Sequence, residues 1–81
     1  MEESDIHDRI VSLLVENFSI KASQATSSAT FRGTLGLDSL DVVDLIFFVQ
    51  QEFSFKAKTA EFRDLKTMAN LVAFVEQKTR Q

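Results

Sequence analysis

The chain has 81 residues, of which 44% are hydrophobic and 26% charged, with a formal net charge of −3 and no cysteine. This length predicts one small domain over residues 1–81, and the lack of cysteine excludes a disulfide framework and a zinc–thiolate site. No apolar run approaches the ~20 residues of a membrane span. The acidic start is also unlike the basic start of a secretory signal, so we expect a soluble protein of the cytoplasm.

The first predicted helix covers residues 5–18. Its apolar side chains recur at the i, i+4, i+7 and i+8 spacing of one helical face: Ile6, Ile10, Leu13, Leu14 and Phe18. Ser4 or Asp5 is the expected N-cap, since short polar side chains can bond the free amides of the first turn.

A long connection follows over residues 19–34, which are rich in Ser, Thr and Ala and show no helical periodicity. Connections of this length are uncommon in so small a domain. We expect Ile20 and Phe31 to fix this one to the core, and part of it to form a helical turn.

The second predicted helix runs from Ser39 to Glu52 or Phe53 and is apolar around much of its circumference. Such a helix lies at the centre of a bundle or carries an apolar patch that binds a partner. Phe47 fits both interpretations, because it can be a core residue or an exposed contact.

Two further helices complete the pattern. A short one lies near Thr59 to Phe62, with Thr59 as its expected cap, and a last one is capped by Thr67 and runs to about Gln77. The last helix is expected to turn four side chains inward: Met68, Leu71, Val72 and Val75. Neither strand alternation nor proline occurs in the sequence. The periodicity therefore predicts a small all-α domain, and the long first connection with short later ones favours a four-helix bundle.

Ser39 stands where the loop before the second helix ends, with an acidic residue on either side of it. Asp38 is a good N-cap residue, and Asp41 is placed to reach back to the amide of Asp38. The free N–H groups and the positive dipole end of a helix's first turn suit an attached phosphate. The spacing alone leaves two interpretations open, a simple helix cap and a serine prepared for phosphorylation or a phosphodiester.

The segment from Leu35 to Asp41, Leu-Gly-Leu-Asp-Ser-Leu-Asp, resembles the prosthetic-group site of acyl carrier proteins, whose hallmark is Asp-Ser-Leu at the start of the second helix. The likeness extends over nearly the whole chain in length, element order and position of the serine. It implies an all-α fold with three longer helices, a short third helix and a long first loop. It also implies that Ser39 carries 4′-phosphopantetheine, which a phosphopantetheinyl transferase installs from coenzyme A and which holds acyl groups as thioesters.

The resemblance also implies partner contacts along the second helix. The transferase, ketosynthases and other acyl-handling enzymes would read five residues there: Asp38, Leu40, Asp41, Asp44 and Phe47. The space between the second and last helices can shelter an acyl chain in this family. The candidates for lining it are Val43, Ile46, Leu65, Met68 and Leu71.

Charge is distributed unevenly around the serine. Residues 38–52 hold four acids and no base, whereas residues 53–66 hold four bases and two acids. The acidic block repels nucleic acid and attracts basic protein surfaces. Because Gln50 and Gln51 stand where primary fatty-acid carriers commonly have acids, we expect a carrier dedicated to a specialised fatty-acid or polyketide-like pathway.

Other functions are less consistent with these residues. The only histidine, His7, is expected at the surface of the first helix, so Ser39 has no evident base and the chain is not expected to be an enzyme. The spacing of Asp38, Asp41 and Asp44 lacks the pattern of a calcium loop, and we expect no metal site. A carrier for aminoacyl groups and a cofactor-free helical adaptor remain as alternatives, and a monomer is expected.

Overall fold

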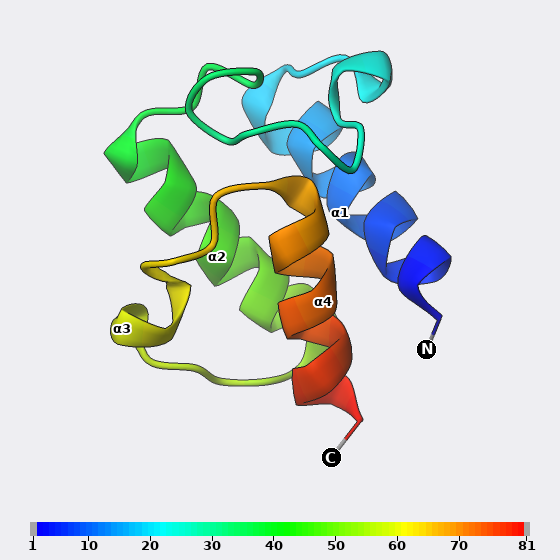
Figure 1. Ribbon diagram of the computed structural model, residues 1–81, viewed down its shortest axis with the longest axis vertical. Coiled ribbons are helices and arrows are strands. Elements are labelled where there is room, and N and C mark those ends of the chain that lie inside the picture. The colour runs from blue at the N-terminus through cyan, green and yellow to red at the C-terminus, as the bar shows by residue number, and fades with distance from the viewer. Residues whose placement is uncertain (1, 81) are drawn as a thin grey trace.

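Four α-helices and one short 3-10 helix make up the part of the chain that the computed structural model describes, residues 2–80 without the side chain of Thr59 (Figure 1). The elements in chain order are α1 Glu3–Phe18, η1 Ala22–Gln24, α2 Ser39–Phe53, α3 Thr59–Phe62 and α4 Met68–Thr79. Within this range there is no strand, and one isolated antiparallel bridge joins Thr30 to Thr67. The predicted all-α, four-helix architecture is therefore confirmed, with the short third helix and long first loop that the family resemblance implied.

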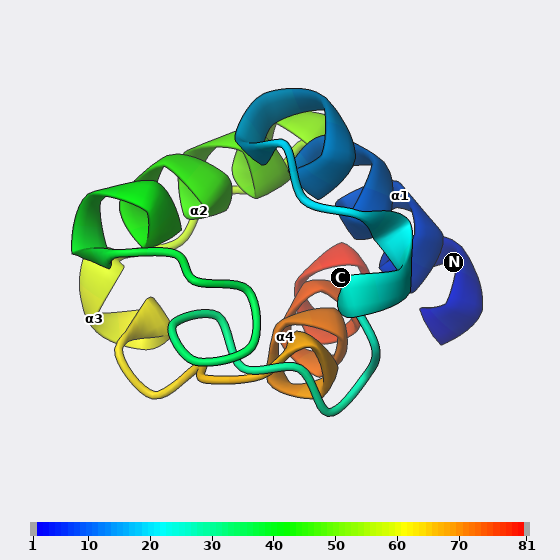
Figure 2. The same ribbon diagram turned by 90° about the horizontal axis from the view of Figure 1, so that it is seen from above.

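The three longer helices are arranged around a common centre (Figure 2), and the side chains buried there are apolar. Each helix contributes its periodic face, and no polar or charged residue is buried in the range 2–80. The side chains that are completely inaccessible include Ile6, Ile10, Leu14, Leu45, Val49, Met68, Leu71 and Val75. Because burial of each such side chain stabilises the fold by about 1.5–3 kcal/mol, this shared face is the main source of stability.

The start of α1 differs from the sequence prediction. The helix begins at Glu3, its N-cap is Glu2, and no side chain caps it. The expected cap at Ser4 or Asp5 was wrong because both residues already belong to the first helical turn. Acidic groups there, including Glu3, interact favourably with the positive end of the helix dipole.

The long connection between α1 and α2 crosses one end of the bundle, and both ends of the described chain lie toward the other end (Figure 1). Ile20 and Phe31 are buried, as predicted, and η1 supplies the expected helical turn. The connection is also hydrogen-bonded to the start of α4. Its backbone bonds join Phe31 N to Lys66 O at 3.1 Å, Met68 N to Ala29 O at 3.0 Å and Ala69 N to Ser27 O at 2.9 Å.

The two later helices begin differently. Thr67 caps α4 as predicted, since its Oγ1 accepts a hydrogen bond from Asn70 N at 3.1 Å. For α3, however, the N-cap is Lys58, whose amide donates to Glu61 Oε2 at 2.8 Å. The predicted cap at Thr59 was wrong by one position, because Thr59 is already the first helical residue, and its side chain lies outside what the structure describes.

Among residues 2–80, no helix combines the length and the apolar character needed to cross a membrane.

Candidate functional site

Ser39 is the first residue of α2 and is exposed to solvent. The loop before Ser39 alternates between buried and exposed residues. Leu35 and Leu37 are buried, whereas Gly36 and Asp38 are exposed. Gly36 has φ +67°, a left-handed conformation that a side chain would strain. The two leucines thus hold the loop against the core and leave the serine at its surface.

A reciprocal capping box fixes the start of the helix. Asp41 N donates to Asp38 Oδ1 at 2.9 Å, and Asp38 N donates to Asp41 Oδ2 at 3.3 Å. The carbonyl of Asp38 also accepts from Val42 N at 3.0 Å. The capping role predicted for both aspartates is therefore confirmed, and Ser39 is held between them by backbone geometry.

The Ser39 hydroxyl is available for chemistry. It makes no hydrogen bond with any other residue in the described part of the chain. It lies at the positive end of the α2 dipole, where the first-turn amides favour a bound or attached anion. An exposed hydroxyl in this position fits a phosphodiester, since the phosphate would lie beside these amides and its substituent would extend into solvent.

Three apolar side chains of α2 form an exposed row beyond the serine. Leu40 is 76% exposed, Val43 59% and Phe47 55%, and their spacing of three and four residues places them on one helical edge. We call these three residues the apolar row. The Phe47 ring lies edge-on to the ring of Phe48, with centroids 6.2 Å apart. The sequence allowed Phe47 to be a core residue or an exposed contact, and the structure shows that it is exposed.

Val43 shows where the sequence analysis missed a surface residue. It was expected to line an acyl-chain site, together with four other residues, but its side chain is mostly exposed. Ile46, Met68 and Leu71 are buried and Leu65 is half-buried. The spacing of Val43 from Leu40 and Phe47 could have indicated its exposure, because the three residues share one helical edge and the other two are also exposed.

The acids beside the apolar row differ from those farther along the chain. Asp38 and Asp44 are exposed and Asp41 is half-buried, and neither ion pair found within residues 2–80 includes them. Glu52, at the far end of α2, accepts instead from Arg9 Nε of α1 at 2.9 Å. Uncompensated negative charge on α2 is therefore confined to its serine end.

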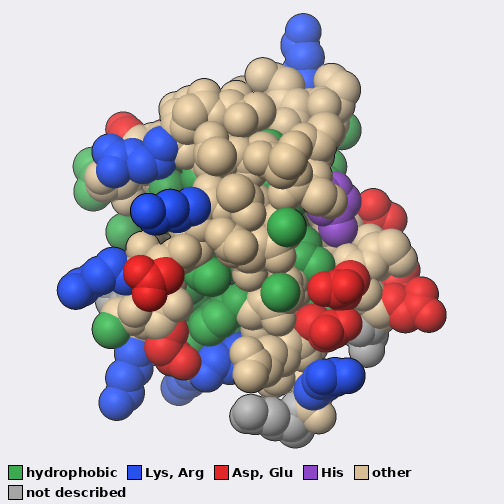
Figure 3. Space-filling model, in the orientation of Figure 1, with side chains coloured by type: hydrophobic (Ala, Val, Ile, Leu, Met, Phe, Trp, Pro, Cys, Tyr) green, Lys and Arg blue, Asp and Glu red, His purple; other side chains and the backbone are tan. Residues whose placement is uncertain are grey.

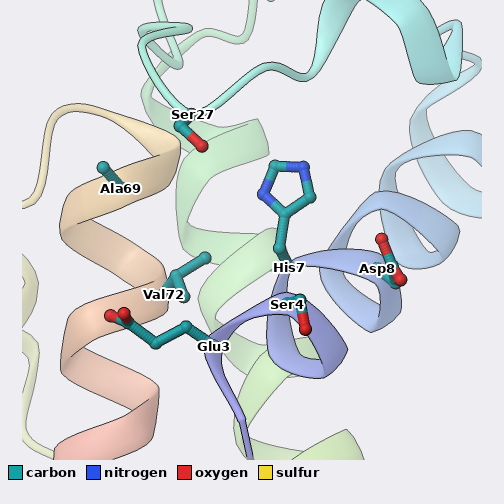
Figure 4. A pocket seen from close by; sticks show the side chains of 7 residues that line it. All are labelled: Glu3, Ser4, His7, Asp8, Ser27, Ala69 and Val72. Atoms are coloured by element: carbon teal, nitrogen blue, oxygen red, sulfur yellow. The ribbon is translucent and has the colours of Figure 1, made fainter.

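His7 does not lie near the serine. With Glu3, Ser4 and Asp8 it lines a hollow of about 350 Å³ between α1, Ser27 and the α4 residues Ala69 and Val72 (Figure 4). The starts of α1 and α2 are on opposite sides of the molecule in both ribbon views. His7 is therefore not placed to act as a base for Ser39. Within the described residues, no three His, Cys, Asp or Glu side chains are grouped to hold a metal ion.

Comparison with known proteins gives consistent results. A family model described as a phosphopantetheine attachment site matches residues 8–75. An acyl carrier protein of Thermotoga maritima is 32% identical over 74 residues, which cover 91% of each chain. An acyl carrier protein of Akkermansia muciniphila is 29% identical over 95% of this chain and 96% of its own. One of Porphyromonas gingivalis is 28% identical over 91% of this chain and 95% of its own.

Proposed function

Because the chain belongs to the phosphopantetheine-bearing acyl carrier protein family, we propose that Ser39 is its attachment residue and that it serves a specialised fatty-acid or polyketide-like pathway. Proteins of this family are carriers rather than catalysts, and their covalent cofactor is 4′-phosphopantetheine. When bound, this group supplies a thiol on a flexible arm that holds an acyl chain as a thioester. The chain has no cysteine of its own for that purpose.

The observation that carries the proposal is the exposed Ser39 hydroxyl at the capped start of α2. Asp38 and Asp41 occupy each other's amides and keep the first turn formed, so the remaining first-turn amides would be positioned beside a phosphate attached to Ser39. The buried Leu35 and Leu37 fix the loop in front of it. The serine is thereby presented to a separate transferase on a rigid support.

The partners follow from the surface around the serine. We propose that the transferase, ketosynthases and other acyl-handling enzymes contact Asp38, Leu40, Asp41, Asp44 and Phe47. Charged groups at such a rim steer association, and the apolar row supplies area to bury. We expect a monomer of the cytoplasm that meets these enzymes one at a time.

The specialised pathway is supported by the charges that follow α2. Lys56, Lys58, Arg63 and Lys66 make that segment basic, and Gln50 and Gln51 leave the end of the helix without free acids. A uniformly basic partner surface would meet repulsion there. The cargo is consequently expected to come from dedicated enzymes rather than from those of primary fatty-acid synthesis.

The test is the intact mass of the protein after incubation with coenzyme A, magnesium and a broad-specificity phosphopantetheinyl transferase. The wild type should gain the mass of one phosphopantetheine, and Ser39→Ala should gain none while remaining folded by circular dichroism. Loading of Ser39→Ala would move the attachment to another hydroxyl. No loading of a folded wild type would contradict the carrier function and favour the cofactor-free adaptor.

A further inference from the structure

The apolar row joins two regions of opposite charge. At its serine end lie the uncompensated carboxylates of Asp38, Asp41 and Asp44. At its other end the chain leaves α2 and reaches Lys56 and Lys58, two exposed bases. Arg63 and Lys66 follow after α3, where the chain has turned back and Phe31 N donates to Lys66 O at 3.1 Å. Figure 3 shows Lys and Arg side chains on the side of the molecule where α3 lies in Figure 1, with Asp and Glu side chains among them.

Residues 56–66, the basic segment, carry more unpaired positive charge than their two acids imply. Of its two acids, Glu61 is already paired, because its Oε1 accepts from Lys78 Nζ of α4 at 2.7 Å. Lys56, Lys58, Arg63 and Lys66 take part in neither ion pair of residues 2–80. The charge of Lys56 is therefore available to a partner, whereas Lys58 also acts on the Glu61 carboxylate, whose pKa it helps to lower.

A groove of about 590 Å³ lies where the apolar row meets this basic segment. Phe47, Phe55 and Lys56 line it, together with Gln50, Gln51, Ser54 and Ala57. Gln50 Oε1 accepts from Ala57 N at 3.0 Å and so ties the following loop to the helix. The groove therefore combines the apolar side chains of Phe47 and Phe55 with one base, Lys56, and the Gln50 bond fixes the backbone just after that base.

We propose that this groove receives an apolar side chain with a neighbouring carboxylate from the docking surface of an acyl-handling enzyme, while basic residues of the same enzyme meet the acids around Ser39. The inference rests on the proposed carrier function and deepens it. A partner with charge of one sign would be attracted at one end of the row and repelled at the other. A partner is attracted along the whole row only if its basic groups lie opposite the acids near Ser39 and its carboxylate lies opposite Lys56. This order of charges would set the orientation of the partner along α2.

The decisive variant exchanges the charges at the two ends of the apolar row and leaves the net charge of the protein unchanged. Asp44→Lys combined with Lys56→Glu reverses the charge order along the row. Glu16→Lys combined with Lys21→Glu is the matched control, because both residues are exposed, lie outside α2 and the basic segment, and exchange the same charges. Each protein is loaded with phosphopantetheine to completion, checked by intact mass, acylated, and assayed for acyl transfer to each purified ketosynthase of the source organism.

We expect the exchange at Asp44 and Lys56 to lower kcat/KM about tenfold or more with at least one ketosynthase in 50 mM salt, and the control exchange to change it less than twofold. The loss should shrink in 0.5 M salt, where surface charges are screened. Phe47→Ala should lower kcat/KM with the same enzyme in both salt conditions.

Two results would overturn the inference. The first is an equal effect of the two exchanges with every ketosynthase. The second is a wild-type dimer in light scattering that the exchange at Asp44 and Lys56 dissociates, since the face would then pair two copies of this chain. A wild type that the transferase cannot load would instead refute the proposed function, so the two failures are distinguishable.

Discussion

The two halves of α2 are held in place by different means. The first half, from Ser39 to Asp44, is held by the local capping box and by the half-buried Val42, whereas Leu40 and Val43 face solvent. The second half packs Leu45, Val49 and Phe53 into the core. Arg9 of α1 adds a further tie there, through Glu52 and through the Phe53 ring 4.7 Å from its guanidinium carbon. Most of the tertiary packing thus lies in the second half, and the half that bears the serine keeps an exposed apolar edge.

The largest expected effect is on the free energy of unfolding, and a leucine-to-alanine change in each half of α2 tests it. Leu45 is fully buried, so Leu45→Ala should lower the free energy of unfolding by about 2–5 kcal/mol through lost burial and the cavity it leaves. Leu40→Ala, the matched control in the exposed half, should change it by less than about 0.5 kcal/mol. Urea denaturation followed by circular dichroism measures both. Equal losses would show that the first half is also packed against the core.

A smaller effect is expected at the cap of the serine-bearing half. Asp38→Ala should lower the free energy of unfolding by about 0.5–2 kcal/mol, because Asp41 N loses its acceptor. Asp38→Asn retains an acceptor oxygen and should lose much less. Amide hydrogen exchange should locate the loosening in the first turn of α2. Uniform exchange along the helix in Asp38→Ala would mean that the two halves are not held separately.

The smallest expected effect is on the melting temperature and concerns Glu61 of α3, outside α2. The hydrogen bond from Lys78 is the main cause that holds the pKa of Glu61 below its usual value of 4.5, and the bond from the Lys58 amide adds to it. A lowered pKa in the folded state means that the stabilisation is present above pH 4.5 and is lost as the pH falls through the folded pKa. Wild type should therefore melt slightly above Glu61→Gln at pH 7.

That advantage should shrink as the pH falls below 4.5 and vanish once Glu61 is protonated in both the folded and the unfolded state. Melting curves of the two proteins, recorded from pH 7 downward, test it. A difference that persists at low pH would trace the tie between α3 and α4 to packing, such as the Phe62 and Phe74 rings with centroids 5.1 Å apart.

Local signals in the sequence predicted much of this architecture. The bounds of α2, the capping pair Asp38 and Asp41, the cap Thr67 and the buried face of α4 all follow from helical spacing and cap chemistry. The start of α1 did not follow, because the helix begins without a side-chain cap. Val43 was misplaced because periodicity shows which residues share an edge but not which edge the neighbouring helices leave uncovered.

Pairings between distant residues were also beyond the sequence. Arg9 and Glu52 are 43 positions apart, and nothing local marks them as partners. The basic segment was visible as composition, whereas the groove that joins it to Phe47 depends on how the chain turns after α2. The position of Ser39 as attachment residue stays a prediction, supported by the geometry of the helix start.

The hydrogen bonds between the long connection and the start of α4 have a consequence for the timing of biosynthesis. Ser27, Ala29 and Phe31 take their backbone partners from residues 66–69, so the loop that leads to Ser39 cannot adopt this shape until those later residues have been made. A nascent chain that ends within α2 already contains the serine but lacks the support that presents it. A transferase that requires this loop shape would therefore act on Ser39 only after translation has passed residue 69.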